Sequence, residues 1–184
     1  MVANISATLP ACSYCNTTVG AFLSYEPRCV KRDISSALGQ VWANDSMIAD
    51  LLSNPLYQTD IGAFQDRLQY TGTDTVGWYG LHAYGHFAVN GDPSGDGYNS
   101  PNEPLFWLHH GQVDRLWWIW QNQRPLERAF QINGTRTLGN SPPSADATIE
   151  DLINVGFVDG EYDEGLAIKN YVSTMGGPLC YIYE

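Results

Sequence analysis

All four histidines of this 184-residue chain lie in two short stretches, LHAYGHF at residues 81–87 and NEPLFWLHHGQVDRLWW at residues 102–118. His82 and His86 are four residues apart. On an α-helix their imidazoles would therefore leave the same face, one turn above the other. Such a pair can bind one metal ion together, and a third ligand must then come from another element.

The second stretch can supply that third ligand from another helix. Asn102 can cap a helix, Glu103 favours the positive end of the helix dipole, and Pro104 is tolerated in a first turn. His109 and His110 are adjacent, about 100° apart around a helix, so only one of them is expected to join the first pair. The spacing does not choose between them. Three neutral imidazoles suit copper or zinc and disfavour magnesium and calcium, which prefer oxygen ligands.

The two stretches resemble the second copper-binding half of the tyrosinase and catechol oxidase family of type-3 copper proteins. That family has a histidine pair at i, i+4, followed by Asn-Asp-Pro-x-Phe-x-x-His-His-x-x-x-Asp-Arg-x-Trp. This chain departs from the pattern at Glu103, where the family usually has Asp. The resemblance implies that His82, His86 and His110 bind copper and that His109 is a neighbour outside the coordination shell.

Two further features belong to the same resemblance. Asp114 stands one turn after His110 and can orient an imidazole and raise its basicity, although an ion pair with an arginine is the alternative. The Tyr181-x-Tyr183 pattern marks the close of the catalytic domain in many members, before a removable shielding domain, and we expect no such domain in this chain. The form of the first stretch is most similar to short secreted fungal polyphenol oxidases.

The histidine count indicates that the copper site is incomplete. A type-3 site holds two coppers with three histidines each, whereas this chain has four histidines and none before His82. We therefore expect residues 1–184 to be the C-terminal part of one tyrosinase-type catalytic domain, binding one of the two coppers. The first-copper half is expected on a companion polypeptide, derived from the same precursor.

The expected fold class is mainly α, half of a type-3 copper four-helix bundle with loop-rich ends and a few short strands. Short strands are expected near residues 148–153 and 181–183, where apolar residues alternate. An apolar stripe on the second ligand helix is expected to lie uncovered by the rest of the chain, namely Leu105, Leu108, Val113, Leu116 and Trp120. From apolar periodicity and capping residues, helices are expected at residues 33–42, 47–52, 61–68, 78–89 and 103–121.

The resemblance implies oxidation of o-diphenols to o-quinones, with dioxygen as co-substrate and water as product. The pocket for the phenol is expected at Ala83, Phe87 and Gly97. Many tyrosinases have Asn at the position of Ala83, which works with a nearby Glu to hold a water, and here Thr73 and Trp78 stand where that Glu often lies. We therefore favour a catechol oxidase over a tyrosinase with monophenol hydroxylase activity. A haemocyanin-like dioxygen carrier is the alternative of a different class, and a metal-free relic of the fold is a third.

Composition favours a secreted protein. The net charge of −11 argues against nucleic acid or an anionic membrane surface as a partner. Sequons for N-glycosylation occur at four positions, Asn4, Asn16, Asn44 and Asn133. An even set of cysteines suits disulfide bonds in an oxidising compartment, with several pairings possible, namely Cys12, Cys15, Cys29 and Cys180. A redox or zinc motif at Cys12-x-x-Cys15 is disfavoured, because no further ligand pair accompanies it.

Overall fold

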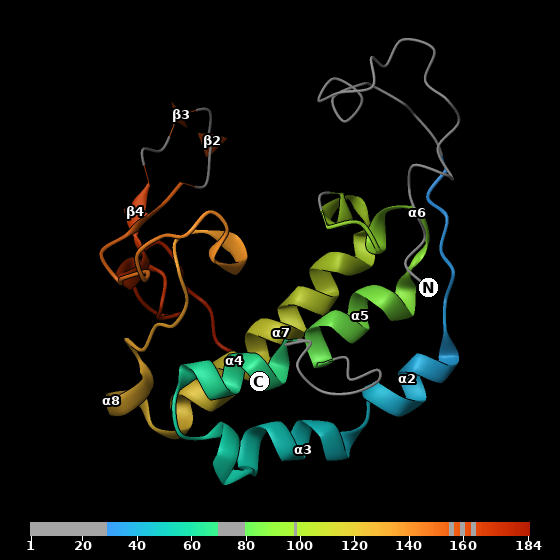
Figure 1. The fold of residues 1–184 in the computed structure, drawn as a ribbon, viewed down its shortest axis with the longest axis horizontal. Helices are drawn as coiled ribbons and strands as arrows, with labels where there is room; N and C mark the ends of the chain where they lie inside the picture. Colours follow the sequence, from blue (N-terminus) through green and yellow to red (C-terminus); the bar gives the residue numbers. More distant parts are fainter. Residues whose placement is uncertain (1–28, 70–79, 98, 155–156, 159–160, 163–164) are drawn as a thin grey trace. The chain divides into compact units, whose positions relative to one another are not determined.

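The computed structural model describes residues 29–69, 80–97, 99–154, 157–158, 161–162 and 165–184 (Figure 1). The chain divides into two units. The first, called the histidine unit, comprises residues 1–48 and 69–113, and the second, called the C-terminal unit, comprises residues 49–68 and 114–184. Two helices belong partly to each unit, α3 (Asp45–Ser53) and α7 (Pro104–Gln123).

The histidine unit is built from helices held together by a short extended segment. Besides the first parts of α3 and α7, its described elements are α2 (Ser36–Trp42), α5 (Leu81–Val89), α6 (Gly91–Ser94) and the 3-10 helix η3 (Ser100–Asn102). The segment before α2 pairs with the end of α5, because the amides of Asp33 and Ser35 donate to the carbonyls of Val89 and Ala88 at 3.1 and 2.9 Å. These bonds fix the C-terminal end of α5 from outside the helix.

Asn102 was the predicted cap of α7, but the residue that caps the helix is Glu103. The Glu103 carboxylate accepts a hydrogen bond from the Leu105 amide at 3.1 Å, and the backbone carbonyl of Glu103 accepts one from the Phe106 amide at 2.9 Å. Asn102 belongs to η3, whose turn immediately before α7 occupies the predicted cap position. Glu103 alone separates η3 from α7, so the helix begins at Pro104, one residue later than its sequence signals suggested.

The C-terminal unit combines helices with two minimal sheets. Its described elements are η2 (Pro55–Tyr57), α4 (Ile61–Leu68), α8 (Pro125–Arg128), η4 (Leu138–Asn140), β1 (Leu152–Ile153), β2 (Phe157–Val158), β3 (Glu161–Tyr162), β4 (Leu166–Ala167) and η5 (Ile168–Asn170). Strand β1 pairs antiparallel with β4, and β2 pairs antiparallel with β3. The mainly α class with a few short strands is therefore confirmed.

The core of the C-terminal unit forms where α4 packs on α7. Phe64 and Trp120 are completely buried with ring centroids 4.9 Å apart, and the Trp120 indole donates to the Tyr57 carbonyl at 3.1 Å. The buried Arg128 guanidinium lies 4.1 Å from the Trp120 ring centroid and donates to the carbonyls of Trp120 and Gln58 at 2.5 and 3.0 Å. The cation is thus buried with its hydrogens satisfied by backbone oxygens.

This core corrects the prediction of an uncovered stripe along α7. Leu116 and Trp120 are 3% and 0% exposed, and the ring of Phe64 on α4 packs against Trp120. The amphipathic character of α4 was visible in the sequence, but its partner was not. Leu108, by contrast, is 73% exposed, as is the neighbouring Trp107 at 65%. The uncovered apolar surface is therefore confined to the first half of the helix.

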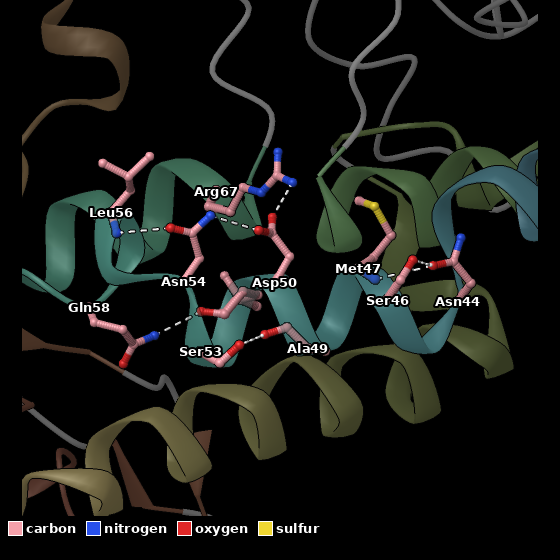
Figure 2. Close-up of polar contacts among 11 residues, drawn as sticks. Asn44, Ser46, Met47, Ala49, Asp50, Ser53, Asn54, Leu56, Gln58 and Arg67 are labelled. Atoms are coloured by element: carbon pink, nitrogen blue, oxygen red, sulfur yellow. Dashed lines mark hydrogen bonds and ion pairs between the residues drawn. The ribbon is translucent and has the colours of Figure 1, made fainter.

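Helix α3 is held by side-chain contacts at both ends (Figure 2). At its start the Asn44 side chain accepts a hydrogen bond from the Met47 amide at 3.1 Å, so Asn44 caps the helix. At its end Asn54 donates to Asp50 at 2.8 Å, and Arg67 of α4 forms an ion pair with the same carboxylate. The second contact ties α3 to α4 within the C-terminal unit.

Most helices lie at the residues where apolar periodicity predicted them. The prediction for the C-terminal residues was wrong. Segment 181–183 forms no strand, although β1 lies at the end of the expected strand region 148–153. Cys29 and Cys180 are exposed free thiols, whereas Cys12 and Cys15 lie outside the described residues, so the disulfides stay a prediction. None of the described helices is long and apolar enough to cross a membrane.

The contact between Phe64 and Trp120 should dominate the stability of the C-terminal unit. We expect Phe64→Ala to lower the free energy of unfolding by about 3 to 5 kcal/mol, because it leaves a cavity against a fully buried indole. Leu138→Ala is the control, since Leu138 is 97% exposed and its loss should change the value by less than about 0.5 kcal/mol. Urea denaturation of both variants checks this, and equal effects would contradict the assigned core.

Candidate metal centre

The four histidines come together from two neighbouring helices of the histidine unit. His82 and His86 lie on α5, and His109 and His110 lie on the first half of α7. One ligand atom from each of the four lies within 4.8 Å of the others. This is the only group of histidine, cysteine or acidic side chains among the described residues that is arranged to hold a metal ion.

Three of the rings point the same nitrogen at one another. The Nε2 atom of His86 is 3.3 Å from Nε2 of His82 and 3.1 Å from Nε2 of His110. A transition metal binds imidazole nitrogen at about 2.0 to 2.1 Å, so two ligands on one tetrahedral ion are separated by about 3.3 Å. The spacing of these nitrogens therefore fits a single ion between them. His82, His86 and His110 form what we call the tri-histidine site.

The opposite ring nitrogens are held by oxygen acceptors. Nδ1 of His86 donates to the carbonyl of Ser94 at 3.1 Å, and Nδ1 of His82 is hydrogen-bonded to the side-chain oxygen of Gln69. A proton held at Nδ1 leaves Nε2 with its lone pair for a metal, and it also fixes the ring plane. Neither partner could be predicted from the sequence, because one is a backbone oxygen and the other precedes His82 by 13 residues.

His109 is bound in a different way from the other three. Its Nε2 donates to the backbone carbonyl of His82 at 2.7 Å, and its ring stacks on that of His82 with centroids 5.7 Å apart. A Cβ at Gly85 would lie 2.1 Å from Cε1 of His109, so only glycine admits the ring at this point. A glycine inside a helical pattern often has such a packing reason, which is the signal that could have revealed this contact. His109 therefore separates and aligns the two helices.

An open cleft lies beside the tri-histidine site. It has a volume of about 510 Å³ and is lined by the three ligand candidates and by all three of the predicted pocket residues, Ala83, Phe87 and Gly97. Its other walls include Asp96, Pro101 and Phe106. The ring of Phe106 stacks on His110 with centroids 4.0 Å apart. A Cβ at Gly97 would meet no atom within 4 Å, so this wall leaves the approach open.

Burial favours the neutral form of three imidazoles, those of His82, His109 and His110. Burial, together with the nearby rings of His86 and His110, lowers the pKa of His82 to about 4 from an ordinary 6.5. Burial likewise lowers the pKa of His109 to about 4, and it lowers the pKa of His110. Neutral imidazole is the form that binds a metal, so His82 is available to a metal at neutral pH without first losing a proton.

Asp114 contacts tyrosines in the C-terminal unit. Its carboxylate accepts hydrogen bonds from the hydroxyls of Tyr181 and Tyr183 at 2.8 and 2.5 Å, and Arg115 donates to the Glu184 carbonyl at 3.2 Å. Burial and the Asp114 carboxylate raise the pKa of Tyr181 to about 12, so its hydroxyl stays a donor. Asp114 and the Tyr181-x-Tyr183 pattern therefore form one contact. The predicted hydrogen bond from Asp114 to an imidazole is not among its observed bonds.

Two of the four sequons lie in the described residues, and they differ in how accessible the asparagine is for glycosylation. The amide nitrogen of Asn44 donates to the Val41 carbonyl at 3.1 Å while its oxygen caps α3, so the side chain is engaged. Asn133 is exposed. Asn4 and Asn16 lie outside the described residues. Glycosylation stays a prediction, with Asn133 as the more accessible acceptor.

These features define a helical protein with a three-imidazole site of the kind that binds copper or zinc. The model of the common central domain of tyrosinase matches residues 10–123, which include both ligand helices up to the end of α7. The chain belongs to the tyrosinase family. Membership implies copper as the metal of this site.

Curated relatives and a solved structure agree with this assignment. The chain is 32% identical to Tyrosinase P of Aspergillus terreus over 86% of its own length and 42% of the relative's. It is 32% identical to the N-acetyl-6-hydroxytryptophan oxidase ivoB of Emericella nidulans, over 88% of this chain and 43% of the relative. A polyphenol oxidase variant from Thermothelomyces thermophila has a similar structure, with a TM-score of 0.73 and 34% identity, over 88% of this chain and 43% of that chain. The chain thus spans about half the length of the proteins it matches.

The geometry predicts which of the adjacent histidines holds the metal. His110→Ala should abolish stoichiometric copper at this site, because it removes one of three converging Nε2 atoms. His109→Ala should retain copper while weakening the fold, since His109 uses its Nε2 on the His82 carbonyl. Metal analysis of the two purified variants decides the matter, and copper lost in His109→Ala but kept in His110→Ala would reverse the assignment.

The lowered histidine pKa values predict acid sensitivity of the metal-free protein. Between pH 6.5 and about 4 the unfolded chain binds protons at His82 and His109 that the folded protein does not. The free energy of unfolding should therefore fall as the pH drops through this window. Denaturation at several pH values tests this, with His109→Ala as the comparison. A slope that is equally steep in the variant would show that His109 does not contribute.

Proposed function

We propose that this chain provides the second-copper half of an o-diphenol oxidase. In the proposed reaction two o-diphenols each lose two electrons and two protons to become o-quinones, and one dioxygen is reduced to two waters. The observation that carries the proposal is the convergence of three Nε2 atoms beside an open cleft. Copper bound there supplies a centre that takes electrons from the phenol and passes them to dioxygen.

The chain's own residues have three tasks in this reaction. The tri-histidine site binds the metal, and the oxygens of Gln69 and Ser94 keep two of its rings in place. The apolar wall formed by Phe87 and Phe106 offers a flat aromatic substrate a dry surface at the metal. Phenols are neutral, so an acidic protein is no obstacle to their approach.

A companion polypeptide from the same precursor is proposed to carry the first copper. Two coppers with three histidines each need six imidazoles, and this chain has four, one of which bonds a backbone carbonyl. The exposed Trp107 and Leu108 on α7 offer an apolar surface for such a partner. An obligate interface of this kind would bury more than about 2,000 Å². We further propose that the assembled protein is a secreted glycoprotein.

The cleft favours diphenols over monophenols. Ala83 contributes only a methyl group to the cleft wall and has no atom that could hold a water for deprotonating a monophenol. Thr73 and Trp78, which stand where a tyrosinase often has its Glu, lie outside the described residues. The hydroxylated aromatic substrate in the name of the Emericella nidulans relative supports phenols as the general substrate class.

A dioxygen carrier with the same copper core is the second candidate. Carriers shield the metal from larger molecules, whereas here the cleft is open and Gly97 adds no side chain above it. This openness favours an enzyme. The two candidates share the metal site and differ in whether a phenol is consumed.

Oxygen consumption separates these functions. We expect the complete copper-loaded protein to consume dioxygen with 4-methylcatechol and form quinone, but to act on tyrosine or phenol only slowly. Reversible oxygen binding without quinone would favour the carrier. Rapid hydroxylation of tyrosine without a lag would instead assign a tyrosinase.

The need for a companion has its own test. The 184-residue chain by itself should bind at most one copper and oxidise no catechol, because three imidazoles cannot hold two coppers. Metal analysis and intact mass of the isolated chain check this. Two coppers per chain together with catechol oxidation would contradict the proposed division.

A further inference from the structure

We infer that Arg32 and Glu103 are a positioning pair that sets how the two histidine-bearing helices meet. This inference rests on the proposed copper site, because it concerns the geometry of that site. Both residues lie outside the coordination shell and outside the cleft lining. All the contacts involved belong to the histidine unit.

The contact is a close, multidentate ion pair. Nε of Arg32 donates to Oε1 and Oε2 of Glu103 at 3.0 and 3.1 Å, and Nη2 donates to Oε1 at 2.6 Å. Glu103 is 0% exposed, and the Arg32 side chain is 37% exposed. The hydrogen bonds from Arg32 hold the pKa of Glu103 below its ordinary value, so the carboxylate is charged at neutral pH. A planar guanidinium fixes the direction as well as the distance of such a partner.

The same carboxylate begins α7. Its Oε1 atom accepts from Arg32 and also from the Leu105 amide at 3.1 Å. His110 follows Glu103 by seven residues, two turns along the same face and about 10 Å along the axis. A displacement at the start of the helix is therefore passed to the His110 ring. Because metal–nitrogen distances tolerate only about 0.2 Å, a shift of about 1 Å would disturb the tri-histidine site.

Arg32 is in turn fixed to the other ligand helix. Its successor Asp33 donates from the amide to the Val89 carbonyl at the end of α5, at 3.1 Å. Its predecessor Lys31 accepts a hydrogen bond at 2.8 Å from the amide of Asp92 on α6. A Cβ at Gly91 would lie 2.2 Å from the Lys31 carbonyl oxygen, so the backbone of this segment lies directly against α6.

The chain of contacts therefore closes between the two helices. Helix α6 ends at Ser94, whose carbonyl holds Nδ1 of His86 at 3.1 Å. Arg32 thus connects the support of His86 with the start of the helix that carries His110. A gain in folding stability does not readily explain such a pair, because the desolvation cost of burying a charge is about as large as the attraction to its partner. A geometric role accounts better for a fully buried glutamate at this position.

Three variants of the complete protein separate positioning from simple stability. Glu103→Asp keeps a capping carboxylate but shortens the side chain by one methylene, about 1.5 Å, and so weakens its reach to Arg32. Arg32→Lys keeps the charge without the planar fork, and Arg32→Met removes the charge. The matched control is Lys169→Met, which breaks the exposed Lys169–Glu150 pair of 2.7 Å.

The probe is Co²⁺ added to the metal-free protein, with its dissociation constant and visible absorption measured beside the thermal midpoint. We expect Glu103→Asp to weaken Co²⁺ binding by about 10-fold, the lower end for residues that support metal ligands, with a changed spectrum and a nearly unchanged midpoint. Arg32→Lys should act in the same direction, Arg32→Met more strongly, and Lys169→Met not at all. If Arg32→Met does not fold, the two conservative variants carry the test.

Wild-type affinity and spectrum in both conservative variants would overturn the inference, whatever happens to the thermal midpoint. A wild-type protein that binds neither Co²⁺ nor copper would instead refute the proposed function, which the inference needs. The two failures are therefore distinguishable.

Discussion

The close approach of α5 and α7 at Gly85 is the constraint on which the metal centre depends. The absence of a side chain there lets the His109 ring lie against α5 and bond the His82 carbonyl at 2.7 Å. Because His110 is the next residue, this placement also brings its Nε2 to 3.1 Å from that of His86. A larger residue at position 85 would push the helices apart and separate the three nitrogens.

Around this contact the chain provides support of two kinds. Within the histidine unit, oxygens from Gln69 and Ser94 hold Nδ1 atoms, and burial favours the neutral form of His82. Within the C-terminal unit, Trp120 in the second half of α7 packs against Phe64, and Asp114 bonds the helix to Tyr181 near the end of the chain. One helix therefore presents ligands from its first half and is anchored by its second half.

Much of this arrangement could be predicted from the sequence, because it depends on local spacing. The i, i+4 pair and the family pattern located both ligand helices, and periodicity placed α4 at its observed bounds. Contacts between distant segments could not be predicted in this way. The residues around Asp114 in the sequence do not indicate that its partners are Tyr181 and Tyr183. Those around Glu103 likewise do not indicate that its partner is Arg32.

The apolar stripe of α7 shows the same limit. Periodicity identified which residues share a face, but it does not say which other helix covers them. Leu116 was predicted to be solvent-exposed, but it is only 3% exposed. Leu108 on the same helix is 73% exposed, as predicted. The choice between Asn102 and Glu103 as cap likewise depended on the preceding turn, which has no strong sequence signal.

The most direct test of this account is a crystal structure of the copper-loaded protein with anomalous scattering at the copper edge. We expect one copper at this site, with Nε2 of His82, His86 and His110 each at about 2.0 to 2.1 Å from the ion. In the same structure His109 should still donate from Nε2 to the His82 carbonyl. Copper bound by His109 in place of His110, or ligation through the Nδ1 atoms, would contradict it.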